Sequence, residues 1–436
     1  HDQTRAIFAN AEIGWKSMIY LTATGRNDWD SRLAFSDYKS FFYPSIGLSA
    51  ILTSMFNAPD WLTYLKVRGS YTEVGNSYGR FMTTVTYPYD EQTQSWTSTS
   101  SYPNTKLKPE RTKSWEVGLD ARILNDISLN LTYYRSNTYN QTFYADLSLS
   151  SGYSNIPIQS GNIMNEGLEM SLGYNKQWKD FSFNTNYTLT WNKNRVKRLA
   201  DGVYNYATGQ PIQMPELSPL TYGHTDARLI LRVGGSMGDV YGQRLLKRDL
   251  NGYILNEEGV GLAMENKETY LGSILPKMNM GWSLGFGYKG VNLGMTFTGR
   301  FGGIVISETQ SVLDAAGVSK VSADVRDAGG VQINQSKVSA QTYYQTIQGT
   351  AAYYTYSATN VRLGELSLSY TLPKKWFDNK VGMTVGLVGK NLWMIYCKAP
   401  FDPELTTSAA SNFYQGFDAY MLPSTRNFGF NVKFQF

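Results

Sequence analysis

The chain has 436 residues and a formal net charge of +5, with 17% charged and 14% aromatic residues. Soluble domains carry roughly 25% charged residues, and no run of Lys or Arg indicates a nucleic-acid partner. The single cysteine, Cys397, excludes an intrachain disulfide, and the two histidines, His1 and His224, argue against a histidine metal site or a Ser-His triad. No apolar run reaches 18 residues, so a membrane-spanning role would require β-strands.

A two-residue alternation of apolar and polar side chains recurs along the chain. At the C-terminus, NFGFNVKFQF places Phe428, Phe430, Val432, Phe434 and Phe436 on one face. Similar runs predict strands over residues 5–13, 65–72, 127–133, 168–175, 181–192, 282–289, 291–298, 365–372 and 427–436. Such runs span about ten residues, as in strands that cross a bilayer, whereas soluble strands average about five or six. We therefore expect the apolar face to meet lipid.

Short and long connections alternate between the predicted strands. Turns are expected near residues 14–17, 53–63, 124–126, 175–180, 289–290 and 373–380. Long loops are expected near residues 27–41, 75–110, 137–162, 194–277, 301–360 and 391–426. Outer-membrane barrels have this arrangement, with short periplasmic turns and long extracellular loops. The predicted fold class is therefore all-β, a transmembrane antiparallel β-barrel.

The number of predicted strands suggests an incomplete wall. We count about thirteen strands, whereas bacterial single-chain barrels have an even number. Additional strand pairs inside residues 194–277 would raise that count. Because the chain should finish on the periplasmic side, its first strand would run inward from outside, and an open sheet would leave two unpaired edges in lipid. We expect residues 1–436 to be the C-terminal portion of a longer barrel chain.

Several segments, in this order, resemble the SusC/RagA family of outer-membrane transporters of Bacteroidetes. They include TGRNDWDSRL at residues 24–33, LKPERTKSWEVGLDARILNDISLNLTYYRS at 107–136, NVRLGELSLSYTLP at 360–373, VGKNLWMIYCKAPFDPEL at 388–405 and PSTRNFGFNVKFQF at 423–436. The resemblance implies a TonB-dependent transporter with a 22-stranded barrel and a lumen plugged by an N-terminal domain. It also implies a SusD-like surface lipoprotein as partner. The signal peptide, the TonB-contacting segment and the plug are absent from these residues.

Two sets of aromatic residues are candidate functional sites under this resemblance. Phe434 and Phe436 resemble the terminal signal that barrel-assembly machinery reads. Tyrosines in the long loops could line a substrate vestibule, contact the lipoprotein, or pack the loops on one another. The sequence does not choose among these three roles for Tyr139, Tyr144, Tyr153, Tyr353, Tyr354 and Tyr356.

Tryptophans are expected in two girdles, one at each membrane interface. Trp15, Trp61, Trp178 and Trp376 lie near the predicted short turns. The opposite strand ends carry Trp29, Trp115, Trp191, Trp282 and Trp393.

Two acidic loop segments are weak candidates for a structural calcium ion, which needs several converging oxygens. Asp249 and Asn251 lie in DLNGYILNEEG, where an ordinary β-turn is the alternative. Asp402 and Glu404 flank Pro403 and could instead order the last long loop. No other cofactor is predicted.

The sequence favours active, TonB-dependent import of a bulky nutrient, an oligosaccharide or a peptide, across the bacterial outer membrane. A passive porin is the alternative, although no clear ring of charges marks a constriction. A soluble β-sandwich or lectin-like protein is a third hypothesis. An enzyme is not expected, because no nucleophile is placed beside a base.

Overall fold

The computed structural model describes residues 2–159, 161–199, 216–257, 261–378, 380–405, 407 and 412–436. Parts of the predicted loops near residues 137–162, 194–277 and 391–426, and of the predicted turn near residues 373–380, lie outside the described residues. The chain divides into two compact units. Unit 1 comprises His1–Lys176, Asn184–Pro219 and Leu231–Ser236, and unit 2 comprises Gln177–Phe183, Leu220–Ile230 and Met237–Phe436.

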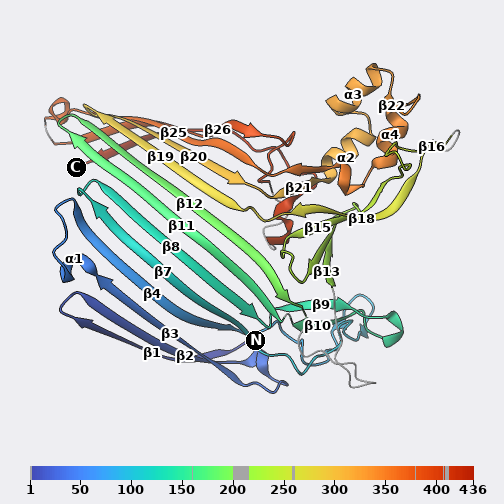
Figure 1. Cartoon of the computed structure of the whole chain (residues 1–436), viewed down its shortest axis with the longest axis horizontal. Helices are drawn as coiled ribbons and strands as arrows, with labels where there is room; N and C mark the ends of the chain where they lie inside the picture. Colours follow the sequence, from blue (N-terminus) through green and yellow to red (C-terminus); the bar gives the residue numbers. More distant parts are fainter. Residues whose placement is uncertain are drawn as a thin grey trace. The chain divides into compact units, whose positions relative to one another are not determined.

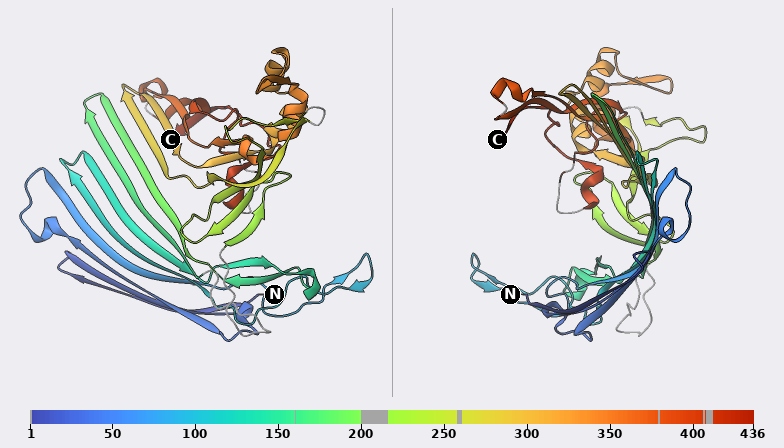
Figure 2. Two further views of the ribbon diagram at one scale, coloured as in Figure 1. Left: turned by 45° about the vertical axis from the view of Figure 1, so that its right-hand side comes forward. Right: turned by 90° about the vertical axis from the view of Figure 1, so that its left-hand side faces the viewer.

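A 13-stranded sheet, the number that the alternation predicts, forms the scaffold, with the strand order β1-β2-β3-β4-β7-β8-β11-β12-β19-β20-β25-β26-β28 (Figure 1). The strands largely in unit 1 are β1 Thr4–Trp15, β2 Ile19–Asp30, β3 Ser40–Ile51, β4 Leu62–Asn76, β7 Glu110–Ile123, β8 Ile127–Tyr139, β11 Asn162–Trp178 and β12 Phe181–Arg198. Those of unit 2 are β19 Met278–Tyr288, β20 Val291–Phe301, β25 Asn360–Leu372, β26 Gly382–Cys397 and β28 Asn427–Gln435. The long blue-to-green strands of unit 1 run side by side in Figure 2.

The strand register keeps the apolar positions of neighbouring strands on one face. In unit 1, Leu119 of β7 pairs with Leu131 of β8, which pairs with Met170 of β11. The next register position pairs Asp120 with Asn130, so the opposite face is polar. A one-residue slip would exchange the two faces, and the alternation therefore specifies this register.

The apolar row of the last strand lies on the surface. In unit 2, Phe430 pairs with Leu387 of β26, and Phe434 pairs with Met383. Phe430 is 69% exposed, Phe434 55% and Phe436 96%. All residues of β28 are exposed because it is the last strand of the sheet. The more informative residue is Val117 of the interior strand β7, which is 57% exposed, as the lipid-facing interpretation of the alternation requires.

Very short connections join several antiparallel neighbours. Leu124 and Asn125, between β7 and β8, both have positive φ values of 51° and 60°. Lys289 and Gly290, between β19 and β20, have φ values of 44° and 88°. The two-residue connection between β19 and β20 has positive φ at both residues, which matches the twist of a tight hairpin, and the β7–β8 connection has one residue more, Asp126. Several strands run beyond the predicted ends, so the connection between β2 and β3 is shorter than the predicted loop at residues 27–41.

Two further connections each contain a single turn of helix. The segment between β3 and β4 contains α1 (Leu52–Met55), and the segment between β25 and β26 contains η4 (Lys374–Phe377). A further helical turn, η1 (Ser31–Leu33), follows β2.

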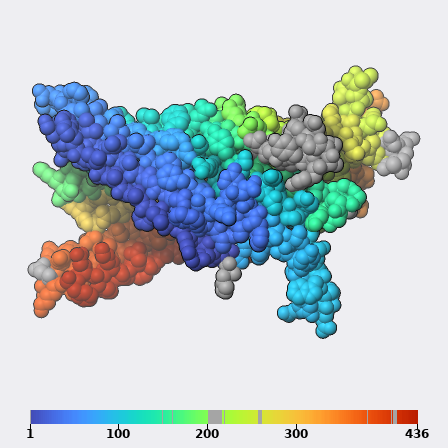
Figure 3. Space-filling model, turned by 90° about the horizontal axis from the view of Figure 1, so that it is seen from below, coloured from blue at the N-terminus to red at the C-terminus, as the bar shows by residue number. Residues whose placement is uncertain are grey.

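The long loops of unit 1 are folded. Residues 77–109 contain the hairpin of β5 (Tyr89–Asp90) and β6 (Ser95–Trp96), and this loop projects in light blue in Figure 3. Residues 140–161 contain β9 (Thr142–Asp146), η2 (Leu149–Ser151) and β10 (Asn155–Gln159). A small core formed by Leu33, Phe41, Tyr78 and Leu107 joins the loop at residues 77–109 to the segment from η1 to the start of β3.

The long connection between β12 and β19 contains a second sheet rather than further strands of the scaffold. Its strand order is β13-β14-β15-β18. The elements are β13 Glu216–Thr221, β14 Arg228–Arg232, β15 Asp239–Leu246, β16 Asn256–Glu257, β17 Gly261–Leu262 and β18 Met264–Ser273.

The loop between β20 and β25 contains short helices, which the two-residue alternation of the sequence does not predict. Each eight-residue helix starts after a serine whose hydroxyl accepts a backbone N–H of the first turn: Ser307 for α2, Ser319 for α3 and Ser339 for α4. The elements are β21 Ile304–Ser307, α2 Glu308–Ala315, α3 Lys320–Asp327, β22 Val331–Ile333, β23 Ser336–Val338, α4 Ala340–Ile347, η3 Ala351–Tyr353 and β24 Thr355–Ser357. The last loop adds η5 (Asn412–Gly416) and β27 (Phe417–Asp418).

Two buried clusters join the loops of unit 2. The first cluster draws residues from all three loops, including Tyr222, Val240, Ile306 and Phe417. The second cluster joins the loop that precedes β19 to the helical loop and includes Leu246, Leu262, Ile347 and Tyr354. These loops therefore form one packed body. Among the described residues, no helix has the length and apolar character needed to cross a membrane.

Candidate functional site

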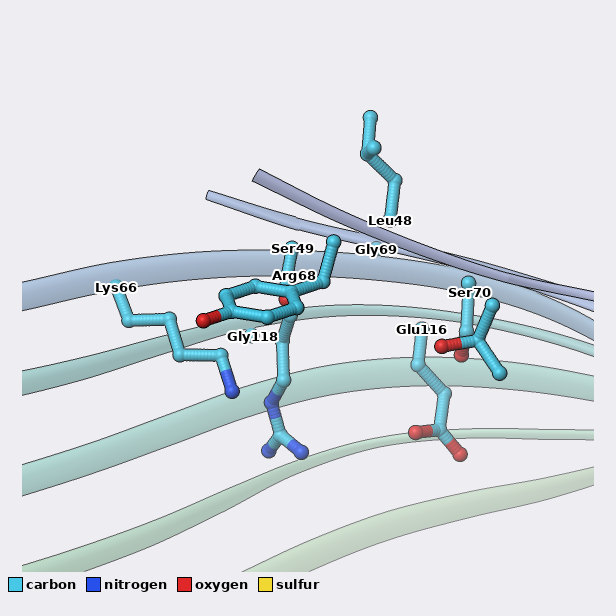
Figure 4. A pocket seen from close by; sticks show the side chains of 11 residues that line it. Leu48, Ser49, Lys66, Arg68, Gly69, Ser70, Glu116 and Gly118 are labelled. Atoms are coloured by element: carbon cyan, nitrogen blue, oxygen red, sulfur yellow. The ribbon is translucent and has the colours of Figure 1, made fainter. Parts of the chain in front are cut away.

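A depression lined mostly by polar side chains lies on the polar face of the unit 1 strands. Its volume is about 200 Å³, and it is formed by β2, β3, β4 and β7. Figure 4 shows Lys66, Arg68 and Glu116 on one side of the strands, while the Leu48 side chain points away from them. The lining residues are Tyr20, Thr22, Gly47, Leu48, Ser49, Lys66, Arg68, Gly69, Ser70, Glu116 and Gly118.

Arg68 lies across strand β7 at the centre of this depression. Its guanidinium donates a hydrogen bond of 2.6 Å to the Thr132 hydroxyl on β8 and lies 4.0 Å from an Asp120 carboxylate oxygen. The side chain passes over Gly118, where an added Cβ would lie 2.4 Å from Arg68 Nε. The missing side chain at Gly118 therefore makes room for the arginine. The alternation predicts a strand over residues 65–72 but no site there, because only the strand register brings β2, β3, β4 and β7 together.

We expect Gly118→Ala to displace Arg68 and remove its bond to Thr132. The free energy of unfolding should fall by about 0.5–1.5 kcal/mol, the usual net contribution of one hydrogen bond. Urea unfolding of the full-length protein would measure this change. Gly47→Ala is the matched control, because the nearest atom to a Cβ at Gly47 is the Ser70 Cβ at 3.9 Å. Equal effects of the two substitutions would contradict the interpretation.

Asp402 and Glu404, candidate calcium ligands, instead face an arginine. Arg362 of β25 donates two hydrogen bonds to Asp402, of 3.0 and 2.8 Å, and lies 3.4 Å from Glu404. The Arg362 and Asp402 side chains are only 11% and 8% exposed. Burial raises the pKa of Asp402, but the hydrogen bonds from Arg362 and the Glu404 backbone outweigh it and leave the pKa below its ordinary value. In this structure the pair ties the last long loop to a strand, which matches the alternative role of ordering that loop, and calcium binding stays a prediction.

Asp249 and Asn251 form a turn. The Asp249 carboxylate accepts backbone N–H bonds from Asn251 and Tyr253, of 2.8 and 3.0 Å. Gly252 has a positive φ of 86°, as such a turn requires. This matches the β-turn alternative. Within the described residues, no group of three or more His, Cys, Asp or Glu side chains is arranged to hold a metal ion.

The six candidate loop tyrosines occupy different surroundings. Tyr139 ends β8 and is half-buried, Tyr144 is exposed, and Tyr153 makes an edge-to-face contact with Tyr102 at 5.1 Å. The other three, Tyr353, Tyr354 and Tyr356, lie in the packed loop body of unit 2.

Tyr353, Tyr354 and Tyr356 contact other residues inside the loop body of unit 2. The Tyr353 hydroxyl accepts the Leu246 backbone N–H at 3.1 Å, and Tyr356 packs edge-to-face on Phe401 at 5.6 Å. Tyr354 is only 2% exposed. Burial, with a smaller contribution from Asp314, raises the pKa of Tyr356 to about 12. The enclosed ring of Tyr354 matches the third of the three roles, the packing of the loops on one another.

The tryptophans near both strand ends are exposed. Trp15 and Trp61 lie beside short turns, and Trp115 and Trp393 lie toward the other ends of β7 and β26. All four are more than two-fifths exposed, which fits girdles at two membrane interfaces.

Comparison with known proteins agrees with this architecture. The family described as TonB dependent receptor-like, beta-barrel matches residues 1–392. TonB-dependent receptor P3 of Formosa agariphila is 25% identical over 98% of this chain and 45% of its own length. TonB-dependent receptor SusC of Bacteroides thetaiotaomicron is 27% identical over 35% of this chain and 14% of its own length.

Solved structures share the fold. The RagAB peptide importer in its open-open state aligns with a TM-score of 0.75 and 20% identity, covering 100% of this chain and 47% of the other. Its closed-closed state gives a TM-score of 0.74 at the same identity, covering 99% and 47%. The chain thus spans about half the length of the relatives and structures that match along its whole length. It is an outer-membrane protein and belongs to the TonB-dependent receptor-like β-barrel family.

Proposed function

We propose that the protein actively imports a bulky oligomer, an oligosaccharide or a peptide, across the outer membrane. The folding of the long loops carries this proposal. In unit 2, three long loops pack into one body with its own buried clusters, whereas Lys289 and Gly290 suffice to join β19 to β20. Loops packed in this way offer a stable surface for holding a large substrate.

The two faces of the sheet support the same role. In unit 1, exposed apolar side chains such as Leu48 and Val117 suit lipid, and the polar depression around Arg68 suits a water-filled or plugged lumen. Family membership supports energy coupling through TonB, acting on a plug domain that lies outside residues 1–436. The likeness to SusC and to the RagAB importer supports a SusD-like lipoprotein as partner and supports both substrate classes.

Uptake by native cells tests the proposal. Fluorescently labelled oligosaccharides and oligopeptides would be offered to cells with the gene intact, with the gene deleted, and with tonB deleted. We expect accumulation of one substrate class to require both genes. Uptake that needs this gene but continues unchanged without TonB would contradict active import and favour a passive porin.

Co-purification addresses the lipoprotein. The full-length protein, purified from native outer membrane in mild detergent, should retain one lipoprotein in a fixed ratio. A preparation without a lipoprotein would remove this part of the proposal.

A further inference from the structure

A second cavity in unit 2 is lined by residues of α2, α3, α4 and the segments that join them. Figure 1 shows where these three helices lie along the chain. The volume of the cavity is about 610 Å³, which is within the range of small-molecule sites. The side chains that line it are mostly polar. They include Asp314, Ser322, Arg326, Gln341, Tyr344 and Gln345.

Asp314 is the buried charge of this cavity, with only 6% of its surface exposed. One carboxylate oxygen accepts a hydrogen bond of 2.7 Å from the Gln310 side-chain amide and another from the Ser319 hydroxyl. Both donors are neutral, and none of the ion pairs found in the described part of the chain includes Asp314. A buried carboxylate is unfavourable unless a cation or several strong donors compensate it.

Asp314 lies between the ends of two helices. It is in the last turn of α2, where the helix dipole has its negative end, and it is hydrogen-bonded to Ser319, which caps the positive end of α3. The two dipoles therefore oppose each other at this carboxylate. Neither of them supplies a full positive charge, so the carboxylate still has no cation beside it among the described ion pairs.

The neighbouring side chains do not supply the missing cation. Tyr344 lines the cavity and is 7% exposed. Burial, followed by the charge of Asp314, raises the pKa of Tyr344, so its hydroxyl stays neutral. Arg326 lines the rim, but its side chain is 62% exposed and lies 3.5 Å from its neighbour Asp327. The cavity is thus lined by a buried anion, Asp314, by an aromatic residue, Tyr344, and by Gln341 and Gln345.

We propose that this cavity binds a primary ammonium group carried by an oligomer, with Asp314 as its counter-ion. An ammonium group can donate to the carboxylate and also contact the Tyr344 ring. Two sources share this chemistry, a peptide chain and an amino sugar. The inference rests on the proposed import function, because it names the chemical class of the substrate.

Binding to the full-length protein in detergent tests the inference by calorimetry. The probes are tetra-alanine amide and a glucosamine tetramer, each with free amines or fully N-acetylated. We expect a free-amine probe to bind about tenfold more tightly than its acetylated form, as expected for a charge-assisted hydrogen bond. Asp314→Asn should remove that difference. Asp324→Asn on α3, where Asp324 pairs with Lys320 at the surface, is the matched control and should retain it.

A second variant tests the site without changing Asp314. Gln345→Lys would place a tethered ammonium group in the cavity and should abolish binding of the free-amine probe. The inference is overturned if free-amine and acetylated probes bind equally, or if neither variant alters the preference. The probe that binds identifies the source, peptide or amino sugar. Calorimetry measures binding without TonB. A negative binding result would therefore contradict this inference alone, whereas uptake that continues without TonB would contradict the proposed function.

Discussion

Replacing Arg362 by alanine should destabilise the last long loop by about 3–5 kcal/mol, the usual effect of removing one partner of a buried ion pair. Arg362 makes two hydrogen bonds to Asp402, and both side chains are nearly enclosed. Without the guanidinium, the Asp402 carboxylate would be buried and uncompensated. Because Arg362 lies on β25 and Asp402 in the loop after β26, the substitution should release the loop from the strand.

Hydrogen exchange of the full-length protein would measure this release as faster exchange at residues 398–405. Lys390→Met is the matched control, because Lys390 and Glu365 form an exposed pair at 3.7 Å. An exposed pair contributes about 0–1 kcal/mol. Combining Arg362→Met with Asp402→Leu should restore much of the loss, since neither charge then remains. Unchanged exchange in Arg362→Ala would show that the pair does not hold the loop.

Introducing arginine at Val117 should lower the free energy of unfolding by about 2–4 kcal/mol, as for a charge on the lipid face near the bilayer centre. Val117 is 57% exposed and lies midway along β7, paired with Gly69 on one side and Tyr133 on the other. An arginine there would have to reach through hydrocarbon to water.

Heat-modifiable migration and urea unfolding of the full-length protein would measure the loss of assembled barrel. Ser70→Arg on β4 is the matched control, because Ser70 lines the polar depression and pairs with Glu116. Ser70→Arg should lower the free energy of unfolding by only about 0–1 kcal/mol, because the side chain at this position faces water. If both arginines were tolerated equally, the two faces would not meet different solvents.

The scaffold could be predicted from the sequence because lipid on one face and water on the other impose a period of two. Residues 427–436 show this clearly, and β28 spans nearly the same range. Strand ends were less predictable, since β2 and β12 continue past the alternating runs. The thirteen strands of the sheet match the predicted number.

The loop body was less predictable because its interactions join residues far apart in the sequence. Arg362 and Asp402 are 40 positions apart, and Asp402-Pro403-Glu404 alone has the composition of a cation site. The eight-residue helices are too short to show a helical period. Their serine caps at Ser307, Ser319 and Ser339 were the available signal.

The shared packing of three loops in unit 2 has a consequence for how such a protein can diverge. Tyr222, Ile306 and Phe417 come from three separate connections and bury one another. A change of volume in one connection must be matched in the other two, because packed interiors tolerate neither voids nor excess atoms. New binding preferences in this lineage should therefore arise by coordinated replacement of all three segments, and grafting any one of them from a relative should give poorly folded chimeras.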